Sequence, residues 1–407
     1  MLSRIVAVAV AVVTAAVVDY APIGSAIRAD GQNPAAAQNP AAPQAPTAAD
    51  VTAAIDKLGS FDYATRTNAA RIIRRASPEV AVAPLVKAAR AHSDEYARFR
   101  ALTLLAGFGG QPARDVMREV QSDRNDRLRT VAFAWFEHNP DPEMLPVLLD
   151  RLTKERSEFV RPALTRALAA HGADPRVRTT LVPLIARGED FFRGALIEAI
   201  GEYDGKYAVA EIAEVAKLDG PLQDDAITAL GRIGDSSQAP LLASLQKTAA
   251  RSVQPTISAA LCLMDLNCAG QEEFLKKTLA VAVKDSSYQD VLRGAAHAWG
   301  VLAARGRPGA LGVLFDAGIP AADPARAPIA LALGMAVLRN PAGVLPALES
   351  RKDRDAALGL LQEAFDMLSE DYEEERFFVE IRKAYWSAAT GSPRRQVAEA
   401  LIQKLEF

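Results

Sequence analysis

The sequence has few cysteines, few aromatic residues and no excess of charge of either sign. Its 407 residues include two Cys, and 6% are aromatic. Two cysteines are too few for a disulfide-built scaffold or a multi-cysteine metal domain. The 47 Lys and Arg residues nearly balance the 50 Asp and Glu residues, whereas a nucleic-acid-binding domain usually carries a basic excess. We therefore expect no nucleic-acid partner.

The sequence also lacks the common motifs of catalysis. We find no H-E-x-x-H, no G-x-S-x-G and no phosphate-binding P-loop. The four histidines, His92, His138, His171 and His297, are scattered, and the acid beside one of them forms the reversed pair Glu137-His138. We expect no catalytic residue, no metal site and no cofactor. His138 and His171 are better explained as cations that cap helix C-termini.

The N-terminus is typical of an export signal. A short basic segment, 1–4, precedes an apolar run from Ile5 to Val18. As a helix this run would cover about 21 Å of a hydrocarbon core about 30 Å thick, so a cleaved signal is favoured over a membrane anchor. Small residues place the cleavage near Ala26, with Ala29 as the alternative site. We expect residues 1–26 to be a signal peptide, the protein to be periplasmic or secreted, and the membrane to be contacted through this segment alone.

Residues 27–48 are rich in Pro, Ala and Gln and hold few apolar groups larger than Ala. Such a segment cannot bury enough surface to offset the entropy lost on ordering. We expect a disordered linker here.

A repeated register begins after the linker. It reads R-x-x-a-x-x-a-l, where lower-case letters are small or aliphatic residues, and it recurs mostly at steps of 30 to 33 residues, with one step of 39. Apolar residues at positions three, six and seven after each anchor form one face of a helix. The anchors are Arg66, Arg98, Arg129, Arg161, Arg193, Gln223, Gln254, Arg293 and Arg326.

A second helical stretch lies between successive anchors. It often holds a proline in an apolar setting, as at Pro84, Pro146, Pro183, Pro240 and Pro346, which suits a first helical turn or a kink. No convincing period-2 alternation predicts a strand. Each unit is therefore predicted to be a pair of helices, and the whole an all-α fold.

These units resemble HEAT repeats in their pattern R-x-x-A-x-x-A-L-G, as in the segment 223–231, Q-D-D-A-I-T-A-L-G. The step near 31 resembles the short bacterial HEAT repeats of phycobilisome-lyase proteins. The resemblance implies a right-handed α-solenoid, a HEAT/armadillo-like superhelix of helical hairpins, over residues 49–345. The register frays after that, so residues 346–407 are expected to be degenerate repeats and a cap.

The anchor arginines are interpreted as a structural ladder. An acid precedes most of them by three or four residues, and it could cap the helix while the arginine bonds it or an acid of the adjoining repeat. The alternative is a row of arginines that binds anionic ligands. It is disfavoured because positions five after the anchors, expected to point outward, mix residues as different as Arg166 and Glu198. The ladder comprises Arg66, Arg98, Arg129, Arg161, Arg193, Arg293 and Arg326.

Two further features leave alternatives open. Cys262 and Cys268 lie six residues apart at a predicted helix end, and are either a disulfide or two buried thiols. The acidic run 370–375 is interpreted as a solvated helix N-terminus, with an acidic rim for a partner as the alternative.

Extended repeat arrays typically present a concave surface to proteins or peptides. We therefore predict an exported, non-catalytic scaffold that binds an envelope protein or peptide. The alternative implied by the resemblance is an accessory enzyme or cofactor-handling protein of the phycobilisome-lyase-like type.

Overall fold

The computed structural model describes residues 45–368 and 371–407. The predicted signal peptide, and all but the last few residues of the predicted linker, lie outside the described residues. Helices and turns account for the described part, in which no strand occurs. Residues 45–407 form one unit, which confirms an all-α solenoid.

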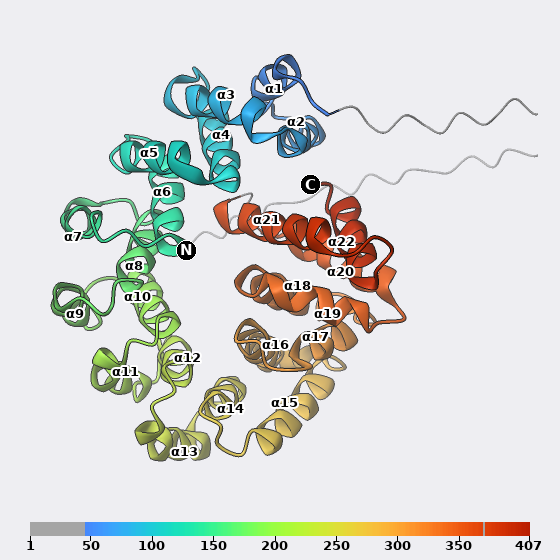
Figure 1. Ribbon diagram of the computed structural model, residues 1–407. Coiled ribbons are helices and arrows are strands. Elements are labelled where there is room, and N and C mark those ends of the chain that lie inside the picture. The colour runs from blue at the N-terminus through green and yellow to red at the C-terminus, as the bar shows by residue number, and fades with distance from the viewer. Residues whose placement is uncertain (1–44, 369–370) are drawn as a thin grey trace, which may run out of the picture. The chain divides into compact units, whose positions relative to one another are not determined.

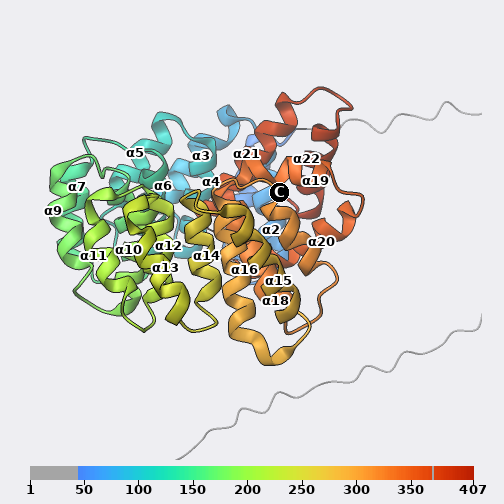
Figure 2. The ribbon, with the colours of Figure 1, turned by 90° about the horizontal axis from the view of Figure 1, so that it is seen from below.

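The helices of this unit lie in two rows (Figure 1). Each even-numbered helix from α2 to α18 contacts the next even-numbered one along the inner row. The odd-numbered helices lie outside them, and Figure 2 shows consecutive helices standing side by side. The inner row consists of α2 (Tyr63–Arg75), α4 (Glu95–Phe108), α6 (Asp126–His138), α8 (Arg161–Ala169), α10 (Asp190–Glu202), α12 (Gln223–Ile233), α14 (Gln254–Leu263), α16 (Gln289–Ala304) and α18 (Arg326–Arg339).

The outer row and the C-terminal helices complete the unit. The outer row consists of α1 (Ala48–Ile55), α3 (Pro78–Ala91), α5 (Gly110–Val120), α7 (Leu145–Lys154), α9 (Pro175–Leu181), α11 (Val209–Ala216), α13 (Ala239–Thr248), α15 (Cys268–Ala282), α17 (Ala310–Gly318) and α19 (Pro341–Glu349). The last helices are α20 (Arg354–Asp366), α21 (Tyr372–Ser387) and α22 (Pro393–Lys404). Short 3₁₀ turns are η1 (Val182–Leu184), η2 (Lys206–Ala208), η3 (Ser236–Gln238) and η4 (Ser286–Tyr288).

The repeated register coincides with the inner row. The helices α8, α12, α14 and α18 begin at anchor residues, and the other anchors lie in the first turns of their helices. The residues three and seven positions after the anchors are all buried, and those six positions after are buried or half-buried. The apolar stripe is therefore the contact surface on which the repeats stack.

Small residues allow the inner helices to approach closely. A Cβ atom at Gly201 would lie 2.7 Å from Ala229 Cα, and one at Gly231 would lie 2.5 Å from Ala260 Cα. Both glycines occupy the eighth position after their anchors. Because backbone atoms stand in the way, a larger residue there would force neighbouring repeats apart.

The C-terminal helices return to the first repeats, which the sequence did not predict. Helix α21 contacts α4 and α6 (Figure 1), and Tyr372 joins the N-terminal core cluster. Glu375 on α21 forms an ion pair with Arg74 on α2, with Oε2 2.7 Å from Nη2, and a second one with Arg382 on its own helix. We call the contact between α21 and the helices α2, α4 and α6 the closing contact.

The boundary expected between residues 345 and 346 falls inside α19, a regular outer-row helix. No single helix among the described residues is long and apolar enough to span a membrane. The consecutive helices α18 and α19 pass that test only as a pair, and they are bent by 116° at the break.

Candidate functional site

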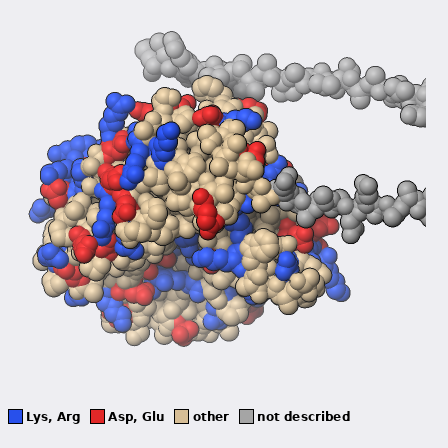
Figure 3. Space-filling view, turned by 45° about the horizontal axis from the view of Figure 1, so that its top comes forward, with Lys and Arg blue, Asp and Glu red and all other residues tan. Residues whose placement is uncertain are grey.

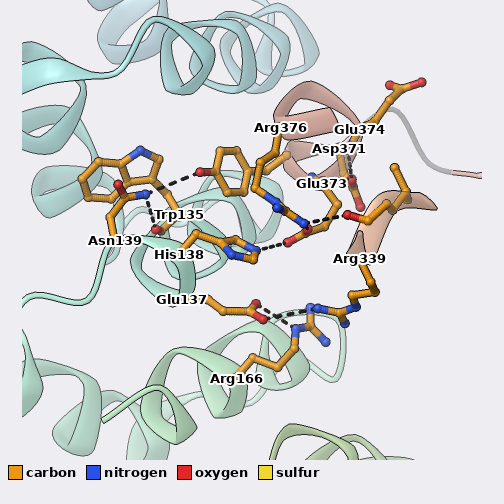
Figure 4. Close-up of polar contacts among 12 residues, drawn as sticks. Trp135, Glu137, His138, Asn139, Arg166, Arg339, Asp371, Glu373, Glu374 and Arg376 are labelled. Carbon is orange, nitrogen blue, oxygen red and sulfur yellow. Dashed lines mark hydrogen bonds and ion pairs between the residues drawn. The ribbon is translucent and has the colours of Figure 1, made fainter. Parts of the chain in front are cut away.

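Charged side chains from distant repeats meet on the inner side of the array (Figure 4). Glu137, near the end of α6, is fully buried and accepts a hydrogen bond from Arg166 Nε at 3.0 Å. Arg339 Nη1 from α18 lies 3.4 Å from its other oxygen, and the Tyr203 hydroxyl donates to that oxygen at 3.2 Å. The carboxylate therefore joins four separate elements of the fold.

A second carboxylate anchors α21 to α6. Glu373 accepts a hydrogen bond from His138 Nε2 at 2.8 Å and contacts Arg376 Nη2 at 3.1 Å (Figure 4). Burial alone would raise the pKa of Glu373, but the hydrogen bond from His138 and the nearby Arg376 and Arg339 lower it to about 2. Glu373 is therefore ionised at any physiological pH and holds the two helices together.

The pKa values of Tyr372, which is buried, and Tyr203, which is half-buried, reflect the same low-dielectric surroundings. Burial, followed by the nearby Glu137 carboxylate, raises the pKa of Tyr203. Burial, followed by the charge of Glu373, raises the pKa of Tyr372. Both phenols consequently stay neutral, and each serves as a hydrogen-bonding group.

Glu137, His138 and Glu373 also offer ligand atoms within 4.8 Å of one another. Carboxylate and imidazole ligands of this kind suit a divalent metal. However, these carboxylates already contact Arg166, Arg339 and Arg376. A metal ion here would lie close to three positively charged guanidinium groups, which would repel it. The arrangement therefore favours an ion-pair network over a metal site. A second group, Cys262, Cys268 and Glu272, includes two cysteines that the structure joins in a disulfide.

The anchor arginines contact acids or carbonyl oxygens near the helix starts. Arg129 is the most fully engaged, because it contacts Asp126 at 2.7 Å and Glu155 at 2.8 Å. The other contacts are Arg66 with the carbonyl oxygens of Ser60 and Phe61, Arg98 with Asp123, Arg161 with Glu158, Arg193 with Asp190, Arg293 with Asp290, and Arg326 with Glu363.

The structure corrects two assignments made from the sequence. Arg166 and Glu198 were expected to point outward, but Arg166 pairs with the buried Glu137 of the neighbouring helix α6, and Glu198 lies 3.8 Å from Arg339 across the inner side. The acidic run was expected to be solvated. Asp371 does cap α21, through the backbone N–H of Glu373, but Glu375 is only 1% exposed. Within 371–375 the side chains are buried or half-buried, because the closing contact covers them.

The two histidines expected to cap helix ends differ in their surroundings. His138 is the last residue of α6, but its main contact is Glu373. His171 follows α8, and its Nε2 is buried with no hydrogen-bond partner among the described residues. Burial lowers the pKa of His171 more than Asp141 and Asp174 raise it, so its charge is not favoured.

A row of large side chains lies at the starts of successive inner helices. Three aromatic residues and one arginine each stand two positions before an anchor: Tyr96, Arg127, Phe159 and Phe191. We call these four residues the aromatic row. The Arg127 guanidinium lies 5.1 Å from the centre of the Tyr96 ring. Phe159 and Phe191 are 84% and 66% exposed. Aligning the repeats at their anchors would have revealed this row in the sequence.

A cavity opens beside the aromatic row, where α21 meets α4 and α6. Its volume is about 630 Å³, and Tyr96, Phe159 and Tyr372 line it together with Arg127 and Arg166. On the face in Figure 3, positive and negative side chains are interspersed and leave a broad uncharged area. Aromatic side chains and arginine, which both line this cavity, are enriched at protein interfaces.

Comparisons with known proteins support the repeat assignment. Residues 51–135 match the family model described as HEAT repeats, which confirms the prediction of HEAT repeats for this segment. No curated protein matches the chain.

Solved structures give weaker likenesses. YibA of E. coli is 18% identical over 53% of this chain and 81% of its own, with a TM-score of 0.38. The complex of CpcE and CpcF of phycocyanin lyase from Nostoc sp. PCC7120 is 17% identical, over 64% of this chain and 96% of that one, with a TM-score of 0.40. A mutant of Kap121p is 13% identical, over 88% of this chain and 50% of that one, with a TM-score of 0.42.

Proposed function

We propose that this HEAT-repeat protein is an exported, non-catalytic scaffold that binds a protein or peptide partner in the cell envelope. The observation that carries the proposal is the aromatic row. Phe159 and Phe191 occupy the same position in adjacent repeats and expose most of their ring surface. Covering one such side chain is worth about 1.5–3 kcal/mol, so the row offers a partner substantial binding free energy.

The neighbouring groups suit the same role. Interface hot spots are enriched in Trp, Tyr and Arg and lie close to recesses that exclude water. Tyr96 and Arg127 line the cavity next to Phe159. A side chain of the partner entering this cavity would contact aromatic rings and a guanidinium together.

The inner side of the array is less suited to a long peptide. Its carboxylates Glu137 and Glu373 are committed to ion pairs and hydrogen bonds with the protein's own groups. A partner would have to break these buried pairs before it could bind there, at a cost of several kcal/mol. Binding at the aromatic row needs no such rearrangement.

Export is supported by the basic segment and apolar run at residues 1–18. Its test is the N-terminus of the mature chain. We expect the tagged protein, purified from its own organism's envelope fraction, to begin near Ile27. A protein that retained Met1 and stayed in the cytoplasm would refute the export part of the proposal.

The binding part is tested by cross-linked purification of the full chain and of matched variants. We expect a reproducible partner protein for the wild type and at least a tenfold lower yield of it for the double variant Phe159→Ala, Phe191→Ala. Phe274→Ala, which removes a partly exposed ring from α15, is the control and should retain the partner. Equal capture by all three proteins would rule out the aromatic row as the interface. A bound chromophore would favour the cofactor-handling alternative.

A further inference from the structure

A second cavity lies between the inner helices α16 and α18, away from the aromatic row. Its volume is about 490 Å³, within the range of about 300–1,000 Å³ that is usual for small-molecule sites. Side chains from α10 and α12 reach it from the opposite side of the array. The two walls of the cavity differ in chemistry, and such a difference fixes the orientation of a ligand.

One wall is apolar and partly exposed. Leu331 and Met335 from α18 lie beside Val301 from α16, and Met367 follows α20 at the same cavity. Leu331, Met335 and Met367 belong to the few large apolar side chains that the described residues leave exposed. Methionines adapt their shape to an irregular apolar ligand. This wall matches an aliphatic chain better than a polar group.

The opposite wall carries the charged groups Arg232, Arg339 and Glu198. Arg339 already donates to Glu137. Arg232 is 7% exposed, and contacts Glu202 at 3.3 Å and Glu198 at 3.8 Å. Neither contact has the geometry of a hydrogen bond, because Nε and Nη1 of Arg232 have no hydrogen-bond partner among the described residues. A buried guanidinium with unused donors calls for an acceptor.

The charges of this wall nearly balance, so its unused hydrogen-bond donors decide which ligand it favours. Burial alone would raise the pKa of Glu198, but the positive charges of Arg339 and Arg232 outweigh burial and lower it. Glu198 therefore carries one negative charge. Burial lowers the pKa of His297, a further titratable group that lines the cavity, and so favours the neutral imidazole. Arg232 and Arg339 share Glu198 and also have their own partners, Glu202 and Glu137, and Arg293 at the cavity is paired with Asp290. The preference for an anion therefore rests on the unused donors of Arg232.

We propose that this cavity binds a small aliphatic carboxylate. The alkyl chain lies along Leu331, Met335 and Met367, and the carboxylate accepts hydrogen bonds from the Arg232 guanidinium. This site is separate from the aromatic row, and it stands or falls independently of the protein-binding function proposed above.

The test measures binding of decanoate to the full chain by isothermal titration calorimetry, with 1-decanol and acetate as comparison ligands. Decanoate should bind at least tenfold more tightly than 1-decanol, a difference of 1.4 kcal/mol, because only decanoate offers the Arg232 guanidinium a charged acceptor. Acetate, which lacks the chain, should not bind measurably. Equal affinity of decanoate and 1-decanol, or no saturable binding of decanoate below its micelle concentration, would overturn the proposal.

Two variants locate the site. Arg232→Gln should remove the preference for decanoate over 1-decanol, whereas the matched Arg293→Gln, which neutralises an exposed arginine of the same cavity, should leave it within about twofold. Should Arg232→Gln fail to fold, Met335→Asp provides the test. It places a negative charge on a partly exposed position of the apolar wall and should weaken decanoate at least tenfold. Unchanged decanoate binding in the folded variant would refute the site.

Discussion

Glu375→Gln is the sharpest test of the closing contact. Glu375 Oε2 accepts a hydrogen bond from Arg74 Nε at 2.7 Å, and Oε1 lies 3.3 Å from Arg382 Nη2. The substitution keeps the size of the side chain and removes its charge. Its main effect should therefore be electrostatic, since two guanidinium groups lose their shared anionic partner.

The expected cost follows from burial. Glu375 and Arg74 are 1% and 5% exposed, and removing one partner of a buried ion pair costs about 3–5 kcal/mol. The glutamine oxygen still accepts one hydrogen bond, and Arg74 keeps its contact with the Phe378 ring at 4.7 Å. We therefore expect a loss near the lower end, about 3 kcal/mol.

Two measurements check this value. Urea unfolding gives the free energy of unfolding, and amide hydrogen exchange shows where protection is lost. Repeats in an open array stabilise only their neighbours, whereas the closing contact joins the first repeats to the last. Glu375→Gln should thus accelerate exchange in both α4 and α21. The control is Glu380→Gln on the same helix, whose exposed pair with Lys383 is worth less than about 1 kcal/mol.

The reasoning fails if Glu375→Gln unfolds with the wild-type free energy, or if α4 keeps its protection while α21 loses it. The first result would mean that the buried pair contributes nothing to stability. The second would mean that α21 does not stabilise the first repeats.

Two further predictions concern other charged groups. Arg129→Ala should lower the free energy of unfolding by about 3 kcal/mol, because Glu155 beside it is 5% exposed. Arg293→Ala should change it by less than about 0.5 kcal/mol, because Arg293 is 62% exposed. Equal losses for the two variants in urea unfolding would contradict this prediction. Burial, followed by the charges of Glu198 and Asp224, raises the pKa of Asp225 to about 6 from 3.8. The folded state therefore favours protonated Asp225, and this stabilisation is lost as the pH rises from about 4 through 6. Asp225→Asn should be about 1–2 kcal/mol more stable than wild type at pH 8, after allowing for partial exposure, and equally stable at pH 4. A constant difference in thermal unfolding between these pH values would refute the assignment.

The repeat architecture could be predicted from the sequence because its causes are local. A helix face is set by residues three, four and seven positions apart, and the register repeats that face along the chain. Ala69, Leu196 and Ile257 illustrate it, since each stands three after an anchor and each is buried. Small residues next to this face let the helices pack closely, as Gly201 and Gly231 show.

The closing contact and the inner ion pairs could not be predicted, because they depend on the accumulated curvature of the whole array. Arg74 and Glu375 are 301 residues apart in the chain, and Glu137 and Arg339 are 202 apart. No periodic pattern marks such a pair. Each repeat adds a small rotation, and an error in any one of them would move the last helix away from the first.

The closing contact changes which surfaces are available for binding. In an open array the concave side would be the natural place for an extended peptide. Here α21 lies against α4 and α6, and Glu137 and Glu373 tie the inner helices together. A polar peptide on the inner side would exchange buried ion pairs for new ones and gain little free energy. Ligands that use free donors or exposed apolar groups meet no such cost. The aromatic row and the cavity beside Arg232 offer such groups, and we therefore expect binding at these two places rather than at the buried ion pairs of the inner side.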